Sequence, residues 1–341
     1  MNLRKYVVWM LALSLMVFVA ACSEDENPAE PTPPVNEFNL LTEVGDDYFT
    51  TYTTASGGVN LPVNRVDPPG LFQLLTDGDA SNDPLIIDYR SSTHYSAKHI
   101  KGAVNINLGS LMDKIEDGTI TKDKRIVNVC YTGQSASVAT AALNLMGFDA
   151  QNLTFGMCGV TSDTNLVPET HRWNSQIIED EYAPNKTSVS PPTTVVPFPT
   201  LNTGKTTAEE IFMARFREVN LASGWGISRL DVTTNPGNYF IVNYWGADDY
   251  NNIGHIEGSY QFTPNLSLQS DEMLKYLPTD KKIVIYCWTG QTSAQVAAYL
   301  RMLGYDAVSM YYGMNGCSFQ SLTKSKYTAP DPPDAYSAIL E

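Results

Sequence analysis

Two cysteines lie in matching surroundings and are the first candidates for covalent chemistry. Cys130 ends the segment Arg-Ile-Val-Asn-Val-Cys, and Cys287 ends Lys-Ile-Val-Ile-Tyr-Cys; a Gly-containing turn and a helix-forming run follow each one. A loop between a buried strand and a helix directs backbone N–H groups and the positive end of the helix dipole toward one point. Thiolates are stabilised at such points. The pattern therefore predicts a sulfur nucleophile in each loop.

The six residues after each cysteine form the predicted anion-binding loop. Neither loop carries Arg or Lys, and the sixth position is Ala136 in one and Ser293 in the other. A Cys-x5-Arg phosphatase needs an arginine at that position to hold phosphate, which argues against a phosphatase. A donor anion must therefore depend on backbone N–H groups and on cations from elsewhere in the chain. The loop residues are Tyr131, Thr132, Gly133, Gln134, Ser135 and Ala136, and Trp288, Thr289, Gly290, Gln291, Thr292 and Ser293.

The surroundings of the two cysteines belong to a longer internal repeat. In both copies a Gly-aromatic-Asp-Ala segment begins 17 residues after the cysteine, at Gly147 and Gly304, and each glycine is a candidate helix C-cap. Upstream, the segment 85–103 aligns with 240–259. Two copies are too few for a solenoid, so the repeat predicts two tandem domains.

Short runs rich in Ile and Val alternate with helix-forming stretches in each copy. This alternation is typical of an α/β fold in which helices cover both faces of a parallel sheet. In the first copy we expect helices at 71–75 and 135–146, and strands at 85–87, 104–106, 126–129 and 153–155.

The order of motifs, Asp-x-Arg, His-Ile-x-Gly-Ala, Cys-x-x-Gly-x-Ser, helix and Gly-aromatic, resembles the rhodanese-like family. The resemblance covers roughly residues 62–160 and 205–320. It implies two tandem rhodanese-like domains, each with a mostly parallel five-stranded sheet and helices on both faces. It also implies a sulfurtransferase without cofactor, in which Cys130 and Cys287 are the catalytic persulfide carriers.

The partners that this resemblance implies are small. The donor would be thiosulfate or a related sulfane-sulfur compound, and the acceptor a thiol, cyanide or a thioredoxin-like protein. Two alternatives without turnover stay open: a rhodanese-fold binding module tethered to a membrane, and a persulfide or redox carrier. The two cysteines favour the enzyme or the carrier, whereas the absence of loop cations favours the binding module or the carrier.

The two copies differ beside the predicted sites. The first has Asp88 and Arg90, which the resemblance makes a structural pair at the edge of the loop, and the second has Asn243 and Trp245. The second site has either lost function or repacked, and we place more weight on Cys130.

His99 and His255 occupy equivalent positions in the two copies. Histidine can act as an acid or base near neutral pH. We favour the other interpretation, in which each supports the turn that enters the next strand.

Cys158 and Cys317 follow the last aromatic-Gly-Met stretch of each copy. In a parallel sheet this position lies near the carboxyl ends of the strands, where the active cysteines also lie. Each is therefore either a resolving thiol that forms a disulfide with Cys130 or Cys287, or a buried inert cysteine.

The N-terminus has the features of an export signal. A short basic region precedes an apolar run at 6–19 that is too short for a bilayer span, and Val-Ala-Ala-Cys ends it at Cys22. Small residues before a cysteine resemble a bacterial lipobox, so we expect lipidation of Cys22; cleavage near Cys22 without lipid is the alternative. The chain would then be anchored to the outer membrane, periplasmic or surface-exposed, by a disordered tether at 23–37.

Composition completes the expected organisation. A net charge of −15 argues against nucleic acid as a partner, and the lack of a Cys-x2-Cys pair argues against a zinc site. The expected segments are a signal peptide at 1–22, the tether, domain 1 at 38–162, a Pro-rich linker at 163–204 and domain 2 at 205–341.

Overall fold

The computed structural model describes residues 35–51, 53–56, 59–62, 64–177 and 184–341. The predicted signal peptide, the lipidation site Cys22 and nearly all of the tether lie outside these residues. Residues 36–341 form one compact unit that contains both repeats. Among the described residues, no helix is long and apolar enough to cross a bilayer.

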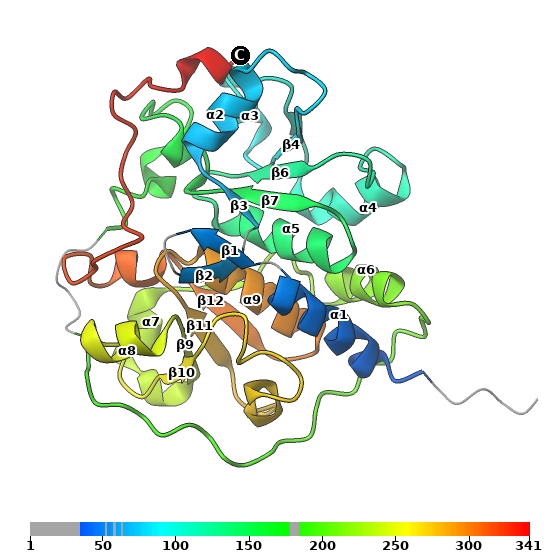
Figure 1. The fold of residues 1–341 in the computed structure, drawn as a ribbon, viewed down its shortest axis with the longest axis vertical. Coiled ribbons are helices and arrows are strands. Elements are labelled where there is room, and N and C mark those ends of the chain that lie inside the picture. Colours follow the sequence, from blue (N-terminus) through cyan, green and yellow to red (C-terminus); the bar gives the residue numbers. More distant parts are fainter. Residues whose placement is uncertain (1–34, 52, 57–58, 63, 178–183) are drawn as a thin grey trace, which may run out of the picture. The chain divides into compact units, whose positions relative to one another are not determined.

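Each repeat builds a parallel five-stranded sheet, as predicted (Figure 1). The strand order is β3-β7-β6-β4-β5 in the first and β10-β9-β11-β12-β8 in the second. The first sheet comprises β3 (Arg65–Val66), β4 (Leu85–Asp88), β5 (Val104–Asn105), β6 (Ile126–Val129) and β7 (Ala150–Leu153). The second comprises β8 (Gly226–Ile227), β9 (Phe240–Tyr244), β10 (Tyr260–Phe262), β11 (Ile283–Tyr286) and β12 (Ala307–Met310).

The cysteine-bearing strands β6 and β11 lie at the centre of their sheets, and every residue in them is buried. Burial on both faces explains why they are continuous Ile- and Val-rich runs with no alternation. The predicted strand at 153–155 is wrong in position, because β7 ends at Leu153 and the chain turns at Phe155, which has a φ of 61°. The strand β7 contains two polar residues, Gln151 and Asn152, so a prediction based on apolar runs placed its start too late.

Two long helices follow the cysteine loops and pack against each other between the sheets (Figure 1). They are α5 (Gln134–Leu145) and α9 (Gln291–Met302), and every residue is buried except Ser135 in α5 and Arg301 in α9. Alanines on both helices allow this close approach. Gly147 and Gly304 have φ values of 82° and 98°, which confirms them as left-handed caps.

Segments that flank one repeat pack on the other. The helix α1 (Glu37–Thr51) precedes the first repeat, yet the hydroxyl of Tyr48 donates to Gln295 in α9. The helix α6 (Ala208–Glu218) precedes the second repeat, yet Arg217 forms an ion pair with Glu116 of the first.

The segments that follow the repeats also cross over. Asn185, in the linker after the first repeat, forms an antiparallel bridge with His255 in the second. Leu340, after the second repeat, bridges Ile100 in the first. Each repeat is therefore completed by a tail from the other.

The remaining elements cover the sheets and connect them. The helices are α2 (Pro68–Thr76), α3 (Ser92–Ala97), α4 (Leu111–Glu116), α7 (Arg229–Thr234) and α8 (Ala247–Asn252), and a short hairpin joins β1 (Thr53–Ser56) to β2 (Val59–Pro62). Short 3-10 turns are η1 (Leu108–Ser110), η2 (Gly156–Gly159), η3 (Glu169–His171), η4 (Pro236–Asn238), η5 (Met273–Tyr276), η6 (Gly313–Gly316) and η7 (Ser337–Ile339).

Candidate functional site

The sulfur of Cys130 lies at the carboxyl end of β6, next to the start of α5. It accepts hydrogen bonds from the backbone N–H of Gly133 at 3.1 Å and of Ala136 at 3.4 Å. Gly133 has a φ of 82°, a left-handed conformation that turns the chain into the helix. Two convergent N–H groups and the helix dipole favour negative charge on the sulfur. The predicted loop geometry is present at Cys130.

The sulfur of Cys287 lies in the equivalent loop but has a different set of donors. It accepts from the backbone N–H of Ser293 at 3.4 Å and from the hydroxyl of Ser293 at 3.4 Å. That hydroxyl also shares a hydrogen bond of 2.8 Å with Ser309 in β12. A side-chain hydroxyl thus joins the amides around the second sulfur, and each cysteine is only 2% exposed.

A glycine in the turn after the last strand makes room for each loop. The backbone N–H of Met157 donates to the carbonyl of Cys130 at 2.8 Å, and that of Met314 donates to Cys287 at 3.0 Å. A Cβ on Gly156 or Gly313 would overlap the same cysteine carbonyl. The aromatic-Gly-Met stretch of each repeat therefore supports the backbone that carries the nucleophile.

The glutamine of each loop reaches into the other repeat. The side-chain oxygen of Gln134 accepts from the backbone N–H of Tyr312 at 2.7 Å. Gln291 accepts from the N–H of Phe155 at 3.1 Å and from the amide of Asn152 at 2.9 Å. These reciprocal bonds fix the two cysteine loops against each other, which the sequence did not predict.

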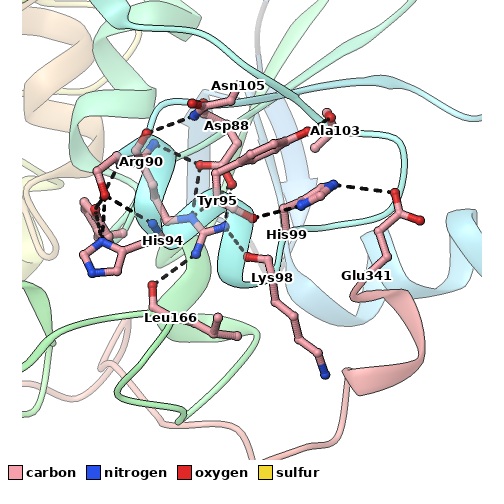
Figure 2. A network of polar contacts seen from close by, with 12 residues as sticks. Asp88, Arg90, His94, Tyr95, Lys98, His99, Ala103, Asn105, Leu166 and Glu341 are labelled. Carbon is pink, nitrogen blue, oxygen red and sulfur yellow. Dashed lines mark hydrogen bonds and ion pairs between the residues drawn. The ribbon is translucent and has the colours of Figure 1, made fainter.

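Asp88 and Arg90 form a buried ion pair at the end of β4, one strand from Cys130 (Figure 2). The guanidinium donates three hydrogen bonds to the carboxylate and also donates to the carbonyls of Leu166 and Lys98. The pair therefore joins the end of β4 to the backbone at Lys98 and Leu166. In the second repeat Asn243 donates instead to Tyr286 at 2.9 Å.

The ring of Trp245, which replaces the arginine, packs on Trp288 with centroids 4.3 Å apart. This geometry favours the interpretation that the second site has repacked.

The two histidines make structural contacts. His99 stacks on Tyr95, hydrogen-bonds its carbonyl at 3.0 Å and lies 3.6 Å from the carboxylate of Glu341 (Figure 2). His255 is fully buried and hydrogen-bonds the carbonyls of Tyr250 and Thr187. The contacts favour support of the turn in both copies.

Cys130 opens into a cleft of about 480 Å³ that sequence reasoning missed. Tyr89 and the loop form one side, the linker residue His171 forms another, and the second repeat supplies Trp225 and Tyr311. Tyr131 lies within the cleft, and its hydroxyl hydrogen-bonds Nδ1 of His94 at 2.6 Å. Two of these walls come from segments outside the motifs, so no local pattern could reveal them.

Arg65 is a buried cation whose charge interacts with the second site. It lies in β3 of the first repeat, opposite Asn152 in the sheet register, and Asn152 contacts the Cys287 loop through Gln291. Burial lowers the pKa of Arg65, and negative charge on Cys287 acts in the opposite direction. A cation from the first repeat thus interacts electrostatically with the cysteine of the second.

Cys158 lies under the first loop, where its backbone N–H donates to the carbonyl of Tyr131 at 3.0 Å. Its thiol donates to the carbonyl of His171 at 3.5 Å, and burial raises its pKa to about 12. A thiol with that pKa is a weak nucleophile at neutral pH. Cys317 is also buried. The resolving role of both cysteines stays a prediction.

Comparisons with known proteins found a matching family model and several solved structures. The family model described as Rhodanese-like domain matches residues 72–163 and 233–316, more than half of the chain. A full-length protein from Lactobacillus plantarum is 22% identical, with 28% of this chain and 80% of that chain covered and a TM-score of 0.25. A rhodanese-like domain protein from Staphylococcus aureus is 24% identical over 28% of this chain and 87% of its own, with a TM-score of 0.24.

A thiosulfate sulfurtransferase from Pseudomonas aeruginosa is 14% identical over 86% of this chain and 49% of its own, with a TM-score of 0.28. No curated protein matches the sequence. The two sheets, the duplicated cysteine loops and the two family matches lead to one conclusion: the chain belongs to the rhodanese-like family, with two copies of its domain.

Proposed function

We propose that the protein is a sulfurtransferase that carries sulfur as a persulfide on Cys130. The observation that supports this most directly is the pair of N–H groups, from Gly133 and Ala136, that point at the sulfur at the start of α5. They stabilise the attacking thiolate and then the negative charge of the persulfide. The adjoining cleft gives a donor access to this otherwise buried atom.

The reaction balances without a cofactor. The thiolate attacks the outer sulfur of thiosulfate, a new S–S bond forms, the old one breaks, and sulfite leaves with the electron pair. An acceptor thiolate then attacks the outer sulfur of the persulfide and regenerates the cysteine thiolate. Cys287 can react in the same way, with the backbone N–H and the hydroxyl of Ser293 as the hydrogen-bond donors that stabilise its sulfur.

Mass measurement after exposure to thiosulfate, 3-mercaptopyruvate or polysulfide tests the proposal. We expect an adduct of about 32 daltons on the peptide that contains Cys130, and none in the Cys130→Ser variant. Release of that sulfur to an added thiol over repeated cycles separates an enzyme from a carrier. Absence of an adduct with every donor would leave only the binding module.

We further propose that lipid on Cys22 anchors the protein to a membrane facing the periplasm or the cell surface. The lipobox-like Val-Ala-Ala-Cys segment supports this. Metabolic labelling with a fatty acid should mark the wild-type chain, and Cys22→Ala should release an unlabelled protein from the membrane fraction.

A further inference from the structure

The cleft beside Cys130 has an aromatic wall that sulfur transfer itself does not require. Trp225 and Tyr311, both from the second repeat, form it, and their rings meet edge to face with centroids 5.3 Å apart. The volume of about 480 Å³ lies in the range of sites for organic ligands. A small inorganic donor would leave most of that space empty.

The charges in the cleft also point away from an inorganic dianion. Among the described residues that line it, none is Lys or Arg. His171 is the basic side chain of the lining, and burial followed by the charge of His94 lowers its pKa, so the ring is mainly neutral at neutral pH. A planar organic group, by contrast, can stack on the rings.

The wall is held rigidly by the edge of the second sheet. The backbone N–H of Tyr311 donates to the carbonyl of Ile227 at 3.0 Å, and the carbonyl of Trp225 accepts from Ser309 at 2.7 Å. The ring of Tyr311 occupies the space that a side chain at Gly226 would need. Glycine at that position therefore allows the ring to lie across β8, at the mouth of the cleft.

The residue of the first repeat that corresponds to Trp225 is not aromatic. Asn152 and Ser309 occupy equivalent positions in the two repeats. Asn152 pairs with Arg65 in the first sheet and Ser309 pairs with Gly226 in the second, so the residues before these partners, Asn64 and Trp225, also correspond. The aromatic wall of the Cys130 cleft comes from the repeat that does not carry Cys130. The aromatic pair is thus specific to the Cys130 site and not a general property of the fold.

From these observations we infer that Trp225 and Tyr311 form a donor-recognition subsite that makes Cys130 select sulfane-sulfur donors with a planar organic group. The inference rests on the proposed persulfide chemistry. For a thiosulfonate, R–SO₂–S⁻, the cysteine thiolate bonds to the terminal sulfur while the bond between that sulfur and the sulfonyl sulfur breaks. The sulfinate R–SO₂⁻ leaves with the electron pair, and its R group lies against the rings.

Two thiosulfonates test the subsite, because they share the reacting group and the charge. In a Cys287→Ser background, the rates at which benzenethiosulfonate and methanethiosulfonate convert Cys130 to the persulfide are measured by peptide mass spectrometry. The ratio of the benzenethiosulfonate rate to the methanethiosulfonate rate is then divided by the same ratio measured with a small free thiol, which gives the corrected ratio. We expect Trp225→Ala to lower the corrected ratio roughly three- to tenfold and Trp225→Phe to restore most of it.

The possible outcomes separate this inference from the proposed function. If neither thiosulfonate gives an adduct on Cys130, and thiosulfate, 3-mercaptopyruvate and polysulfide also give none, the proposed function fails. If adducts form but the corrected ratio is the same in wild type and Trp225→Ala, the subsite is refuted and the persulfide chemistry stands. Should Trp225→Ala fail to fold by circular dichroism, Tyr311→Leu serves as the second variant with the same expected fall.

Discussion

The two cysteine sites have the same backbone but different neighbours. Both sulfurs lie at the end of a central strand and before a fully packed helix. Around Cys130 the neighbours are aromatic rings and an open cleft, whereas Cys287 accepts a hydrogen bond from the hydroxyl of Ser293 and interacts electrostatically with Arg65. In each site the distinctive residues include some from the opposite repeat. Duplication fixed the geometry of the nucleophile, and the edge strand of the other copy set its environment.

Removal of one sulfur at a time should give the largest effect. We expect Cys130→Ser to reduce persulfide transfer from benzenethiosulfonate to the background rate, because the remaining sulfur faces no aromatic wall. Cys287→Ser should keep most of this activity. Sulfinate release measures both variants, and substantial transfer in Cys130→Ser would show that the sites are equivalent.

The buried pair of the first repeat should matter more for stability than its counterpart in the second. Arg90→Met leaves the carboxylate of Asp88 buried without its partner, which should lower the free energy of unfolding by about 3–5 kcal/mol. Asn243→Ala should cost only about 1 kcal/mol, because it removes one neutral hydrogen bond to Tyr286. Urea unfolding measures the loss of unfolding free energy in each variant. Equal losses would contradict the greater importance of the buried ion pair for stability.

The reciprocal glutamines allow a symmetric test of how the loops are joined. Gln134→Leu leaves the N–H of Tyr312 without its acceptor and should lower the free energy of unfolding by about 1–3 kcal/mol. Gln291→Leu deprives two donors, on Phe155 and Asn152, and should cost at least as much. Losses well below this range in calorimetry would mean that other contacts join the loops.

Arg65→Gln should separate the two sites by charge. Without the guanidinium we expect thiosulfate to convert Cys287 to the persulfide roughly tenfold more slowly, while the same reaction at Cys130 changes little. Peptide mass spectrometry reads both cysteines in one sample. A matched loss at both sulfurs would point to a general structural effect.

The smallest effect should come from the thiol under the first loop. Because burial raises the pKa of Cys158 to about 12, the folded protein keeps this proton at pH values where the unfolded chain loses it. The contribution is complete below the unfolded pKa and is lost as pH rises toward 12. We expect the unfolding free energy of wild type to fall more steeply over this window than that of Cys158→Ala. Parallel pH profiles would disprove the shift.

Local patterns in the sequence predicted the parts of this comparison that the two repeats share. The Ile- and Val-rich runs predicted β4 and β6, because burial on both faces leaves a continuous apolar signature, and the helix-forming run after Cys130 predicted α5. The glycines after each cysteine predicted the turns. These features depend on residues close together in the chain.

The parts in which the repeats differ could not be predicted from such patterns. Trp225 and Arg65 lie more than 60 residues from the cysteines they approach, and nothing in their immediate surroundings marks them as site residues. Asn152 looks like a loop residue, yet it is a buried strand residue whose side-chain N–H donates to Gln291 from the other repeat. Contacts between the two repeats depend on residues far apart in the chain, so they leave no periodic pattern in the sequence of either repeat.

The crossed tails have a mechanical consequence. The linker segment at Asn185 forms a backbone bridge with His255 in the second repeat, and the segment at Leu340 forms one with Ile100 in the first. Neither repeat can therefore separate from the other without losing backbone hydrogen bonds. The two halves should melt in one calorimetric transition, and expression of either half alone should yield an incompletely folded polypeptide. A gene that began as a duplication thus now encodes an inseparable pair.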